Sequence, residues 1–337
     1  MKKVLITGVG GYIGSVGASV FLDNGYSVVG IDNFSKGFRQ PIEATRKKYG
    51  KDRYEFYECD LNDEKKLDDI FDKIGEFEAV IHFAAFCNVN ESMENPGKYF
   101  TNNINGTLNI LNSMHKHSIK SLVFSSTCAT YGTPDVLPVT ENLSTHPDSP
   151  YGESKLMVEK IIDWYGKLFG IKYCIMRYFN VCGATIDGSI GDSKKPSVHL
   201  IQNAVLGALG VRPFQLTCGS VETPDGTPIR DYVDIVDLVE AHLAAVEYLG
   251  QDGESNIFNI GTGEGNSVLE IVETVKKYTG VSFEIEKGQS RMGESAMVYA
   301  NPEKANKILK WKSKRNIEDS VKSLIIWYKS RPNGWEF

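Results

Sequence analysis

The chain has 337 residues, of which 41% are hydrophobic and 24% charged, and it carries a formal net charge of −6 at pH 7. These proportions are typical of a globular protein with a well-buried core, and the acidic balance without a long basic run disfavours a nucleic-acid partner. No stretch approaches the ~20 apolar residues of a membrane span, and the apolar run after the initial MKK is too short for an export signal. We therefore expect a cytoplasmic protein with no membrane partner.

Short apolar stretches alternate with amphipathic stretches through the first half of the chain. The short stretches, rich in β-branched and aromatic residues, predict strands at 2–8, 26–32, 54–60, 79–85, 121–127 and 172–178. The amphipathic stretches predict helices at 12–24, 63–74, 98–117 and 151–169. This alternation indicates an α/β fold, a Rossmann-type doubly wound parallel sheet with helices on both faces.

After about residue 180 the chain becomes rich in Gly, Ser, Pro and Asp, which predicts long loops. Helices are expected between these loops at 200–209, 235–248, 268–279 and 317–329. We expect a first domain at 1–180 and a smaller α/β domain at 181–337, with later segments returning to the first domain.

The cysteines and histidines do not predict a metal site. The six cysteines are scattered without a CxxC pair, so we expect free thiols. His115 and His117 are two residues apart, and on a helix they would point to different faces.

The first predicted strand runs directly into GVGGYIG, which places Gly8, Gly10, Gly11 and Gly14 ahead of a helix. Glycines at such a turn let a dinucleotide pyrophosphate approach the backbone and the amides at the helix N-terminus. The second strand ends at Asp32, whose carboxylate could accept hydrogen bonds from the adenosine ribose and would repel a 2′-phosphate. The sequence therefore predicts NAD, rather than NADP, as the cofactor.

Residues at the ends of the next two strands are candidates for the same cofactor site. Asp60 and Leu61 end the third strand, and Phe83, Ala84 and Ala85 end the fourth. Small residues there would let a cofactor lie flat across the carboxyl edge of the sheet. Close packing of a helix on the strand explains them equally well.

A candidate proton-transfer pair follows the fifth strand. Tyr151 and Lys155 lie four residues apart at a predicted helix start, so both side chains fall on one face. The fifth strand ends in Ser125, Ser126 and Thr127, whose hydroxyls could surround a substrate hydroxyl. The pKa of a free tyrosine is near ~10, and we expect the Lys155 ammonium and a positive nicotinamide to lower it, which would make Tyr151 a base. Taken alone, the pair fits a solvated surface equally well.

Several motifs spread over nearly the whole chain carry a resemblance to a known family. They are GxxGYIG, Asp32-Asn33, FSST followed by YG, SPYGxSK, RYFN, TPDGTxIRDY and RxGE. In these motifs the chain resembles the extended short-chain dehydrogenase/reductase family, and most of all its UDP-glucose 4-epimerase branch. SPYGxSKLMVE and TPDGTxIRDY are the specific pieces, whereas many dehydrogenases share the glycine motif.

The resemblance implies a nucleotide-sugar 4-epimerase that keeps NAD⁺ bound and interconverts UDP-glucose and UDP-galactose through a 4-keto sugar. Tyr151 would take the proton of the C4 hydroxyl, Thr127 would hydrogen-bond the same oxygen, and Lys155 would bind the nicotinamide ribose. The cofactor residues it implies are Gly8, Gly11, Tyr12, Ile13, Gly14, Asp32, Asn33, Asp60, Leu61, Phe83, Ala84, Ala85, Asn102, Ser125, Tyr151, Lys155 and Tyr178.

For the UDP-sugar substrate, the resemblance assigns most contacts to the second domain. Arg230 and Arg291 would grip the diphosphate, as charge-assisted arginine–phosphate bonds suit a nucleotide anchor. Glu294 would meet the uridine ribose. The full set is Thr127, Tyr151, Asn180, His199, Leu200, Arg230, Arg291, Glu294 and Val298.

Some positions depart from the family pattern, and others distinguish between reactions or substrates within the family. Relatives that dehydrate the sugar carry an acidic pair just after the strand-end Ser/Thr, where this chain has Cys128 and Ala129, so dehydration is disfavoured. Cys87 stands where a cofactor-contacting lysine is common, and His199 replaces an asparagine. Val298 stands where some relatives have a bulky tyrosine, and a small residue there could admit an N-acetyl group at C2. Glu294 replaces the usual aspartate.

Alternative readings remain open at this stage. UDP-N-acetylhexosamines, UDP-pentoses and UDP-uronates are alternative substrates. A net reductase or dehydrogenase that exchanges its cofactor with solution is a different reaction class, and a dinucleotide-sensing scaffold is a reading without catalysis. The resemblance also suggests a homodimer through the helices at 98–117 and 151–169, although the outer apolar positions of those helices could be core.

Overall fold

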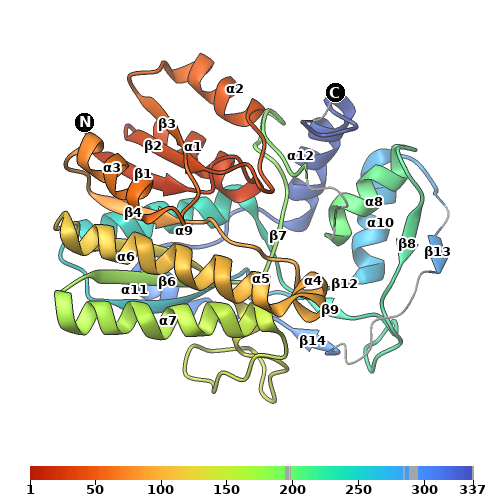
Figure 1. Cartoon of the computed structure of the whole chain (residues 1–337). Coiled ribbons are helices and arrows are strands. Elements are labelled where there is room, and N and C mark those ends of the chain that lie inside the picture. Colours follow the sequence, from red (N-terminus) through yellow and green to blue (C-terminus); the bar gives the residue numbers. More distant parts are fainter. Residues whose placement is uncertain (194–196, 198, 284, 288–294, 336–337) are drawn as a thin grey trace.

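The computed structural model describes residues 1–193, 197, 199–283, 285–287 and 295–335. Its centre is a sheet of seven parallel strands in the order β11-β6-β5-β4-β1-β2-β3 (Figure 1). The strands are β1 (Lys3–Thr7), β2 (Ser27–Asp32), β3 (Tyr54–Glu58), β4 (Ala79–His82), β5 (Ser121–Thr127), β6 (Lys172–Tyr178) and β11 (Asn256–Ile260). The predicted doubly wound α/β sheet and its six predicted strands are confirmed. The seventh strand, β11, was not predicted.

Helices cover both faces of this sheet because successive strand residues point to opposite sides. Val4 and Ile6 of β1 belong to one buried cluster, and Leu5 belongs to the other. The first face is covered by α1 (Tyr12–Asp23) and α9 (Ile235–Gly250), which contact each other. The second is covered by α3 (Glu64–Ile74), α6 (Gly106–Lys116) and α7 (Pro150–Phe169), whose apolar residues line the second cluster.

The helix predicted at 98–117 has a more complex form than expected. It comprises α5 (Pro96–Phe100), a π-helical turn η1 (Thr101–Asn105) and α6. Two further helices of this half, α2 (Gln40–Tyr49) and α4 (Val89–Glu94), were not predicted. The lysine- and arginine-rich α2 has a weak apolar face, which explains why periodicity did not reveal it.

Apart from α9, β11 and the helix α11 (Glu303–Ile308) that packs against β11, the chain after residue 180 forms small sheets and helices at one end of the large sheet (Figure 1). β7 (Asn180–Cys182) pairs with β10 (Tyr232–Asp234), and β9 (Ile229–Arg230) lies between β12 (Asn266–Ser267) and β14 (Met297–Val298). β8 (Phe214–Leu216) pairs with β13 (Ile285–Lys287). The helices at this end are α8 (Leu200–Ala208), α10 (Val268–Thr279) and α12 (Ile317–Ser330). A 3-10 turn, η2 (Cys128–Thr130), follows β5.

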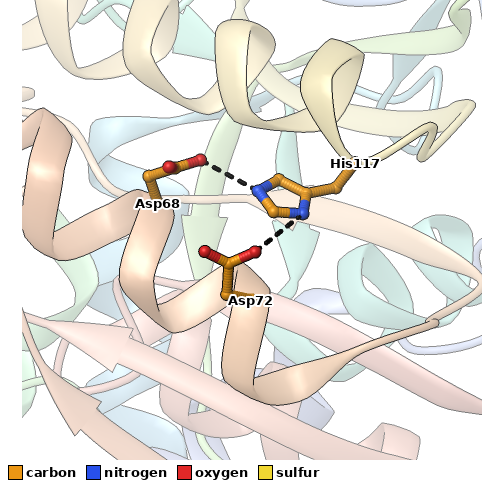
Figure 2. Close-up of side chains that lie close together, drawn as sticks. All are labelled: Asp68, Asp72 and His117. Carbon is orange, nitrogen blue, oxygen red and sulfur yellow. Dashed lines mark hydrogen bonds and ion pairs between the residues drawn. The ribbon is translucent and has the colours of Figure 1, made fainter.

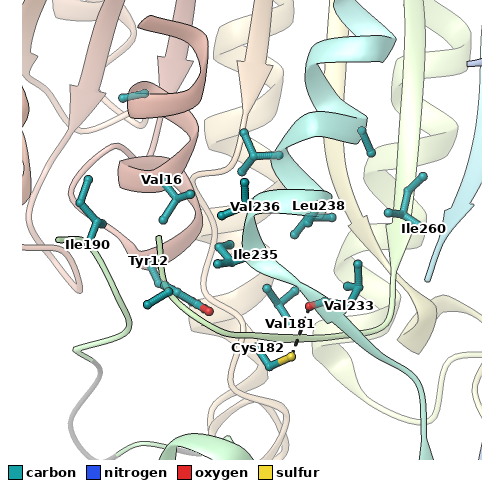
Figure 3. Close-up of a cluster of buried hydrophobic side chains, with 14 of the residues drawn as sticks. Tyr12, Val16, Val181, Cys182, Ile190, Val233, Ile235, Val236, Leu238 and Ile260 are labelled. Carbon is teal, nitrogen blue, oxygen red and sulfur yellow. Dashed lines mark hydrogen bonds between the residues drawn. The ribbon is translucent and has the colours of Figure 1, made fainter. Parts of the chain in front are cut away.

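A buried junction joins this second part to the first helix of the sheet (Figure 3). Tyr12 and Val16 of α1 belong to the same apolar cluster as Val181 of β7 and Val233 of β10. The Tyr12 hydroxyl donates to the carbonyl of Gly183 at 2.5 Å. The glycine turn before α1 is therefore held against β7. Among the described residues, no helix has the length and apolar character needed to cross a bilayer.

Candidate active site

The glycine turn after β1 forms a tight backbone cradle at the start of α1. Gly8 has a φ of +78°, and a Cβ added to it would lie 2.9 Å from the amide nitrogen of Ala84. A Cβ added to Gly14 would lie 2.1 Å from the carbonyl oxygen of Gly8. Both contacts exclude a side chain, so only glycine lets the turn pack this closely against Ala84 and against the start of α1. This cradle fits a dinucleotide pyrophosphate, which needs close approach to helix N-terminal amides.

The first residues of α1 contribute to this cradle through their backbone. The Tyr12 ring is buried and directed to Gly183, so only its main chain is available to a ligand at the turn. Ile13 is partly buried and packs against the same apolar cluster.

Asp32 lies at the end of β2 and is fixed by backbone amides. Its Oδ2 accepts the Gly10 N–H at 2.8 Å, and its Oδ1 accepts the Phe34 N–H at 2.7 Å. Burial raises the pKa of Asp32, and these backbone hydrogen bonds oppose the rise. Asn33 donates to Asp60 at 2.9 Å, which joins the ends of β2 and β3. The arrangement suits hydroxyl groups of an adenosine ribose, because each carboxylate oxygen retains acceptor capacity.

Two residues near Asp32 and Asp60, Leu61 and Arg39, already bond to other groups of the chain. The carbonyl of Leu61 accepts from the Asn109 side chain at 2.8 Å, which links the end of β3 to α6. Arg39, a residue able to favour NADP, is paired with Glu58 and covers the Phe34 ring at 4.2 Å.

Phe83, Ala84 and Ala85 follow β4 rather than end it. The Ala84 N–H donates to the hydroxyl of Thr7 at 3.2 Å, and the Phe83 ring lies 4.8 Å from that of His242. The Phe83 ring therefore takes part in packing, whereas Ala84 lies against the glycine turn. Packing therefore explains the position of Phe83, and a contact between Ala84 or Ala85 and the cofactor stays a prediction.

Asn102 and its neighbour Asn103 differ in burial and in hydrogen-bond partners. Asn103 is buried and exchanges hydrogen bonds with the Phe86 backbone, at 2.9 Å to its amide and 3.1 Å to its carbonyl. Asn102 is half-buried and donates to Asn103 at 3.0 Å. Sequence reasoning missed Asn103, because several other asparagines and threonines surround it in the same stretch and nothing local distinguishes it.

The strand-end hydroxyls and the Tyr151–Lys155 pair are brought together. Lys155 is buried and donates to the carbonyl of Ser125 at 2.8 Å, with its ammonium 4.7 Å from the centre of the Phe124 ring. Tyr151 is also buried and is hydrogen-bonded by the Thr127 side chain. Of the two readings considered for this pair, the structure excludes a solvated surface position.

Tyr178 joins this group from β6. The Ser125 hydroxyl and the Tyr178 hydroxyl lie 2.6 Å apart. These side chains come from two adjacent strands and from α7, so their positions are fixed by regular secondary structure rather than by loops.

The electrostatics of the pair differ from the sequence expectation. Burial raises the pKa of Tyr151 well above its ordinary value, with further contributions from Tyr178 and Cys87, and the Thr127 hydrogen bond opposes the rise. Burial lowers the pKa of Lys155 to about 8. The expectation that Lys155 lowers the pKa of Tyr151 is therefore wrong for the chain itself, because the ammonium is directed to the Ser125 carbonyl and both groups lose hydration.

Cys87 lies close enough to this pair to act on both side chains. The negative charge of its thiolate form would help to raise the pKa of Tyr151 and would partly offset the lowering of the pKa of Lys155. The departure from the family pattern noted at this position therefore falls beside the reacting groups.

A buried ion pair behind the strand end was not predicted. The Arg177 Nε donates to Glu159 at 3.0 Å, and the Ser126 hydroxyl donates to the same carboxylate. The Arg177 guanidinium lies 4.8 Å from the centre of the Tyr131 ring. An arginine inside an apolar strand was the available signal for this pair, since a buried charge needs a partner.

Four of the predicted substrate residues line a cavity of about 140 Å³. Asn180, His199, Leu200 and Arg230 all contribute to its wall. Asn180 donates to the carbonyl of Asp231 at 3.2 Å, and Arg230 Nη1 donates to the carbonyl of Ile229 at 2.9 Å. The cavity is lined by β7, the start of α8, β8 and β9.

Asp231, next to Arg230, organises the loops around this cavity and was not singled out from the sequence. Its carboxylate accepts the amides of Thr262, Gly263 and Ala300 at 2.9, 3.0 and 3.1 Å. Asp231 is fully buried. Asp231 therefore joins its own strand end, next to Arg230, to the segments at 262–263 and at 300.

The remaining substrate predictions lie elsewhere. Val298 is opposite Arg230 in the β14–β9 register but does not line the cavity, and packs with Cys128 against the Tyr131 cluster. Arg291 and Glu294 lie outside the described residues.

Asp68 and Asp72 of α3 and His117 after α6 form a separate group on the surface (Figure 2). His117 Nε2 lies 2.9 Å from Asp68, and His117 Nδ1 lies 3.7 Å from Asp72. Lys116 also pairs with Asp68. Hydrogen bonds and ion pairs between these side chains account for the grouping.

The glycine cradle, the fixed carboxylate after β2 and a buried tyrosine–lysine pair on one sheet edge define a dinucleotide-dependent α/β enzyme. Residues 4–261 match the family described as "NAD dependent epimerase/dehydratase family", and the chain belongs to that family.

Relatives match over the whole chain. It is 40% identical over 336 residues to the UDP-glucose 4-epimerase of Lactobacillus helveticus, covering 99% of each chain. It is 39% identical over 342 residues to UDP-arabinose 4-epimerase 1 of Arabidopsis thaliana, covering 99% of this chain and 81% of the relative. The crystal structure of UDP-glucose 4-epimerase from Bifidobacterium longum in complex with NAD⁺ and UDP superposes with a TM-score of 0.93 at 34% identity, covering 99% and 100% of the two chains.

Proposed function

We propose that this chain is an NAD-dependent nucleotide-sugar 4-epimerase that interconverts UDP-glucose and UDP-galactose. The observation that carries the proposal is the buried group of Thr127, Tyr151 and Lys155 at the sheet edge that holds the glycine cradle. The full-length similarity to UDP-glucose 4-epimerases supports the same reaction.

The cofactor would lie across the carboxyl edge of the sheet. The cradle around Gly8 and Gly14 fits the pyrophosphate, Asp32 fits the adenosine ribose, and Lys155 is available to the nicotinamide ribose. Bound NAD⁺ supplies a hydride acceptor that becomes the donor later in the same catalytic cycle.

The residues of the chain supply proton transfer and anchoring. The phenolate form of Tyr151 would be favoured by the positive nicotinamide of bound NAD⁺. In that form Tyr151 would take the proton from the C4 hydroxyl of the sugar and return it when the sugar is reduced on its other face. Thr127 hydrogen-bonds Tyr151 and would bond the same sugar oxygen. Arg230 would hold the diphosphate from the cavity of the second part, and Asn180 would contact the sugar nucleotide there. Anchoring the diphosphate leaves the sugar free to turn over between the two hydride transfers.

Substrate choice within the class is the finer part of the proposal. UDP-glucose and UDP-galactose come first, and UDP-pentoses are an alternative supported by the similarity to a UDP-arabinose 4-epimerase. UDP-N-acetylhexosamines are a further alternative that the small Val298 suggested from the sequence, but Val298 does not line the cavity and gives no structural support for them. An activity panel of UDP-hexoses, UDP-N-acetylhexosamines, UDP-pentoses and UDP-uronates, with products separated by chromatography, identifies the preferred sugar.

Retention of the cofactor distinguishes epimerisation from net oxidation or reduction. An epimerase should purify with NAD bound and turn over without added NAD. NADH formation in step with substrate consumption would instead identify a dehydrogenase and contradict the proposal.

We also propose that residues 1–180 bind NAD, that residues 181–337 bind the nucleotide sugar, and that the protein acts in the cytoplasm as a homodimer. Support for a dimer comes from α7, where Trp164 is 60% and Leu168 is 65% exposed. Large exposed apolar side chains on one helix suit an interface between copies. Trp164→Glu should yield monomers in analytical ultracentrifugation, whereas Ile186→Glu, at an equally exposed position outside this helix, should not.

A further inference from the structure

His82 ends β4 and lies buried between two threonines. Its Nδ1 is 2.7 Å from the hydroxyl of Thr7, and its Nε2 is 2.9 Å from the hydroxyl of Thr107. The side chain is 2% exposed, and the proposed chemistry makes no use of it. A buried imidazole with both nitrogens engaged raises the question of which nitrogen carries the proton.

The neighbouring hydrogen bonds answer that question. The Thr107 hydroxyl donates to the carbonyl of Asn103 at 2.7 Å, and a carbonyl can only accept. Since a hydroxyl has one proton, Thr107 must accept from His82, and Nε2 carries the hydrogen. Burial, reinforced by the Lys155 charge, lowers the pKa of His82 to about 3, so the ring is neutral and Nδ1 accepts from Thr7.

The hydrogen bonds therefore run in one direction through the sheet. The Ala84 N–H donates to Thr7 at 3.2 Å, Thr7 donates to His82, His82 donates to Thr107, and Thr107 donates to Asn103. Because the direction is fixed, each side chain can donate its hydrogen only if the next group in the chain is free to accept it. An apolar side chain of equal size at Thr7, His82 or Thr107 would leave a buried polar partner unpaired.

The two ends of this chain of hydrogen bonds reach the two halves of the candidate active site. Ala84 lies against the glycine turn, since a Cβ on Gly8 would be 2.9 Å from its nitrogen. At the other end, the directional chain stops at the main-chain carbonyl of Asn103. The side-chain amide of the same residue, a separate group, donates to Ser154 at 3.0 Å, and the Ser154 hydroxyl donates to the carbonyl of Tyr151 at 2.7 Å. Asn103 lies in the π-helical turn η1, a feature that often accompanies functional sites.

We propose that His82 is a positioning residue, which as its Nε2–H tautomer holds the cofactor-facing segment 83–86 in register with the first turn of α7. The hydrogen-bond direction, and not only the volume of the ring, sets the distance between the glycine cradle and Tyr151. The cofactor role of the segment rests on the proposed NAD site.

The tautomer is tested directly on the wild-type holoenzyme labelled with ¹⁵N-histidine. We expect one imidazole with a protonated Nε2 and a bare Nδ1, unchanged between about pH 6 and about pH 9. A protonated Nδ1 at His82, assigned by comparison with a His82→Asn variant, would overturn the inference. This measurement does not depend on enzymatic activity.

The positioning role is tested with Thr107→Val, which keeps the side-chain shape and removes one hydrogen-bonding hydroxyl. We expect NAD retention and kcat each to fall roughly 10-fold, while the KM for the UDP-sugar changes less than about 2-fold. Ser113→Ala, which removes another buried hydroxyl from the same helix, is the matched control and should behave as wild type. Thr107→Val behaving like Ser113→Ala would overturn the proposal.

Two further outcomes separate this inference from the proposed function. If Thr107→Val does not fold, Thr7→Val carries the same test from the other side of the ring. If the wild type acts on no UDP-sugar, a loss of bound NAD in Thr107→Val would still support the positioning role, although the proposed reaction would be wrong.

Discussion

Replacing Lys155 by methionine tests how much the buried ammonium lowers the free energy of unfolding. The pKa of Lys155 falls from its ordinary value of 10.5 to about 8 because the side chain is buried. Since a pKa difference of one corresponds to about 1.4 kcal/mol, keeping Lys155 charged in the folded chain costs about 3 kcal/mol at neutral pH. Loss of the hydrogen bond to the Ser125 carbonyl offsets part of the gain in Lys155→Met, by about 1–3 kcal/mol.

The pH dependence isolates the buried ammonium from that hydrogen bond. A lysine whose pKa is lower in the folded state binds fewer protons there than when unfolded between the two pKa values, so the free energy of unfolding rises with pH. For Lys155 this rise falls between about pH 8 and the unfolded value of 10.5. The wild type should therefore gain about 2.5 kcal/mol relative to Lys155→Met between about pH 7 and about pH 10.

The assay is urea unfolding of both proteins at several pH values, after removal of bound nucleotide, because a ligand that binds only the folded state adds its own stabilisation. Lys160→Met, at an exposed position of the same helix, controls for loss of a lysine from α7, and its difference from wild type should stay nearly constant. A Lys155→Met difference that also stays constant with pH would refute the reasoning. Epimerase activity of Lys155→Met should be lost at every pH.

Three further substitutions test other parts of the site. Tyr151→Phe should lower kcat by about 10²–10⁴ while the protein still purifies with NAD, and an unchanged rate would rule out the proposed proton transfer. Glu159→Gln should lower the free energy of unfolding by about 3 kcal/mol, because Arg177 keeps a buried charge without its partner, and a double variant with both side chains replaced by methionine should lose less. Arg230→Met should raise the KM for UDP-sugars by about 10–100-fold without changing NAD content, and an unchanged KM would place the diphosphate elsewhere.

The sheet and the cofactor edge were predictable because their signals are local. Apolar runs predicted six strands, and the position of Asp32 after the second strand placed it beside the glycine turn. β11 was missed because Asn256–Ile260 is a short strand that carries asparagine at two of its five positions, which weakens the apolar signal. Its pairing with β6 depends on contacts distant in sequence.

The partners of individual polar groups were less predictable. Ser125, Ser126 and Thr127 were treated as one set of hydroxyls, yet Ser125 meets Tyr178 and Ser126 meets Glu159. Strand alternation alone indicates that neighbouring residues face different surroundings. The spacing of Tyr151 and Lys155 correctly indicated one helix face, but only the packed structure shows that the ammonium bonds a strand carbonyl.

The direction of the pKa shifts at this edge of the sheet gives the site a common physical character. Burial raises the pKa of Tyr151 and lowers those of Lys155 and His82, so all three shifts favour the neutral form. The fold has therefore already removed water from these groups before any ligand arrives, and a charge introduced by a bound ligand acts in a medium that screens it weakly. A charged ligand therefore changes the pKa of Tyr151 more than the same charge would in water. The same burial that makes the pKa of Tyr151 sensitive to a ligand also lowers the stability of the fold, because it buries Lys155.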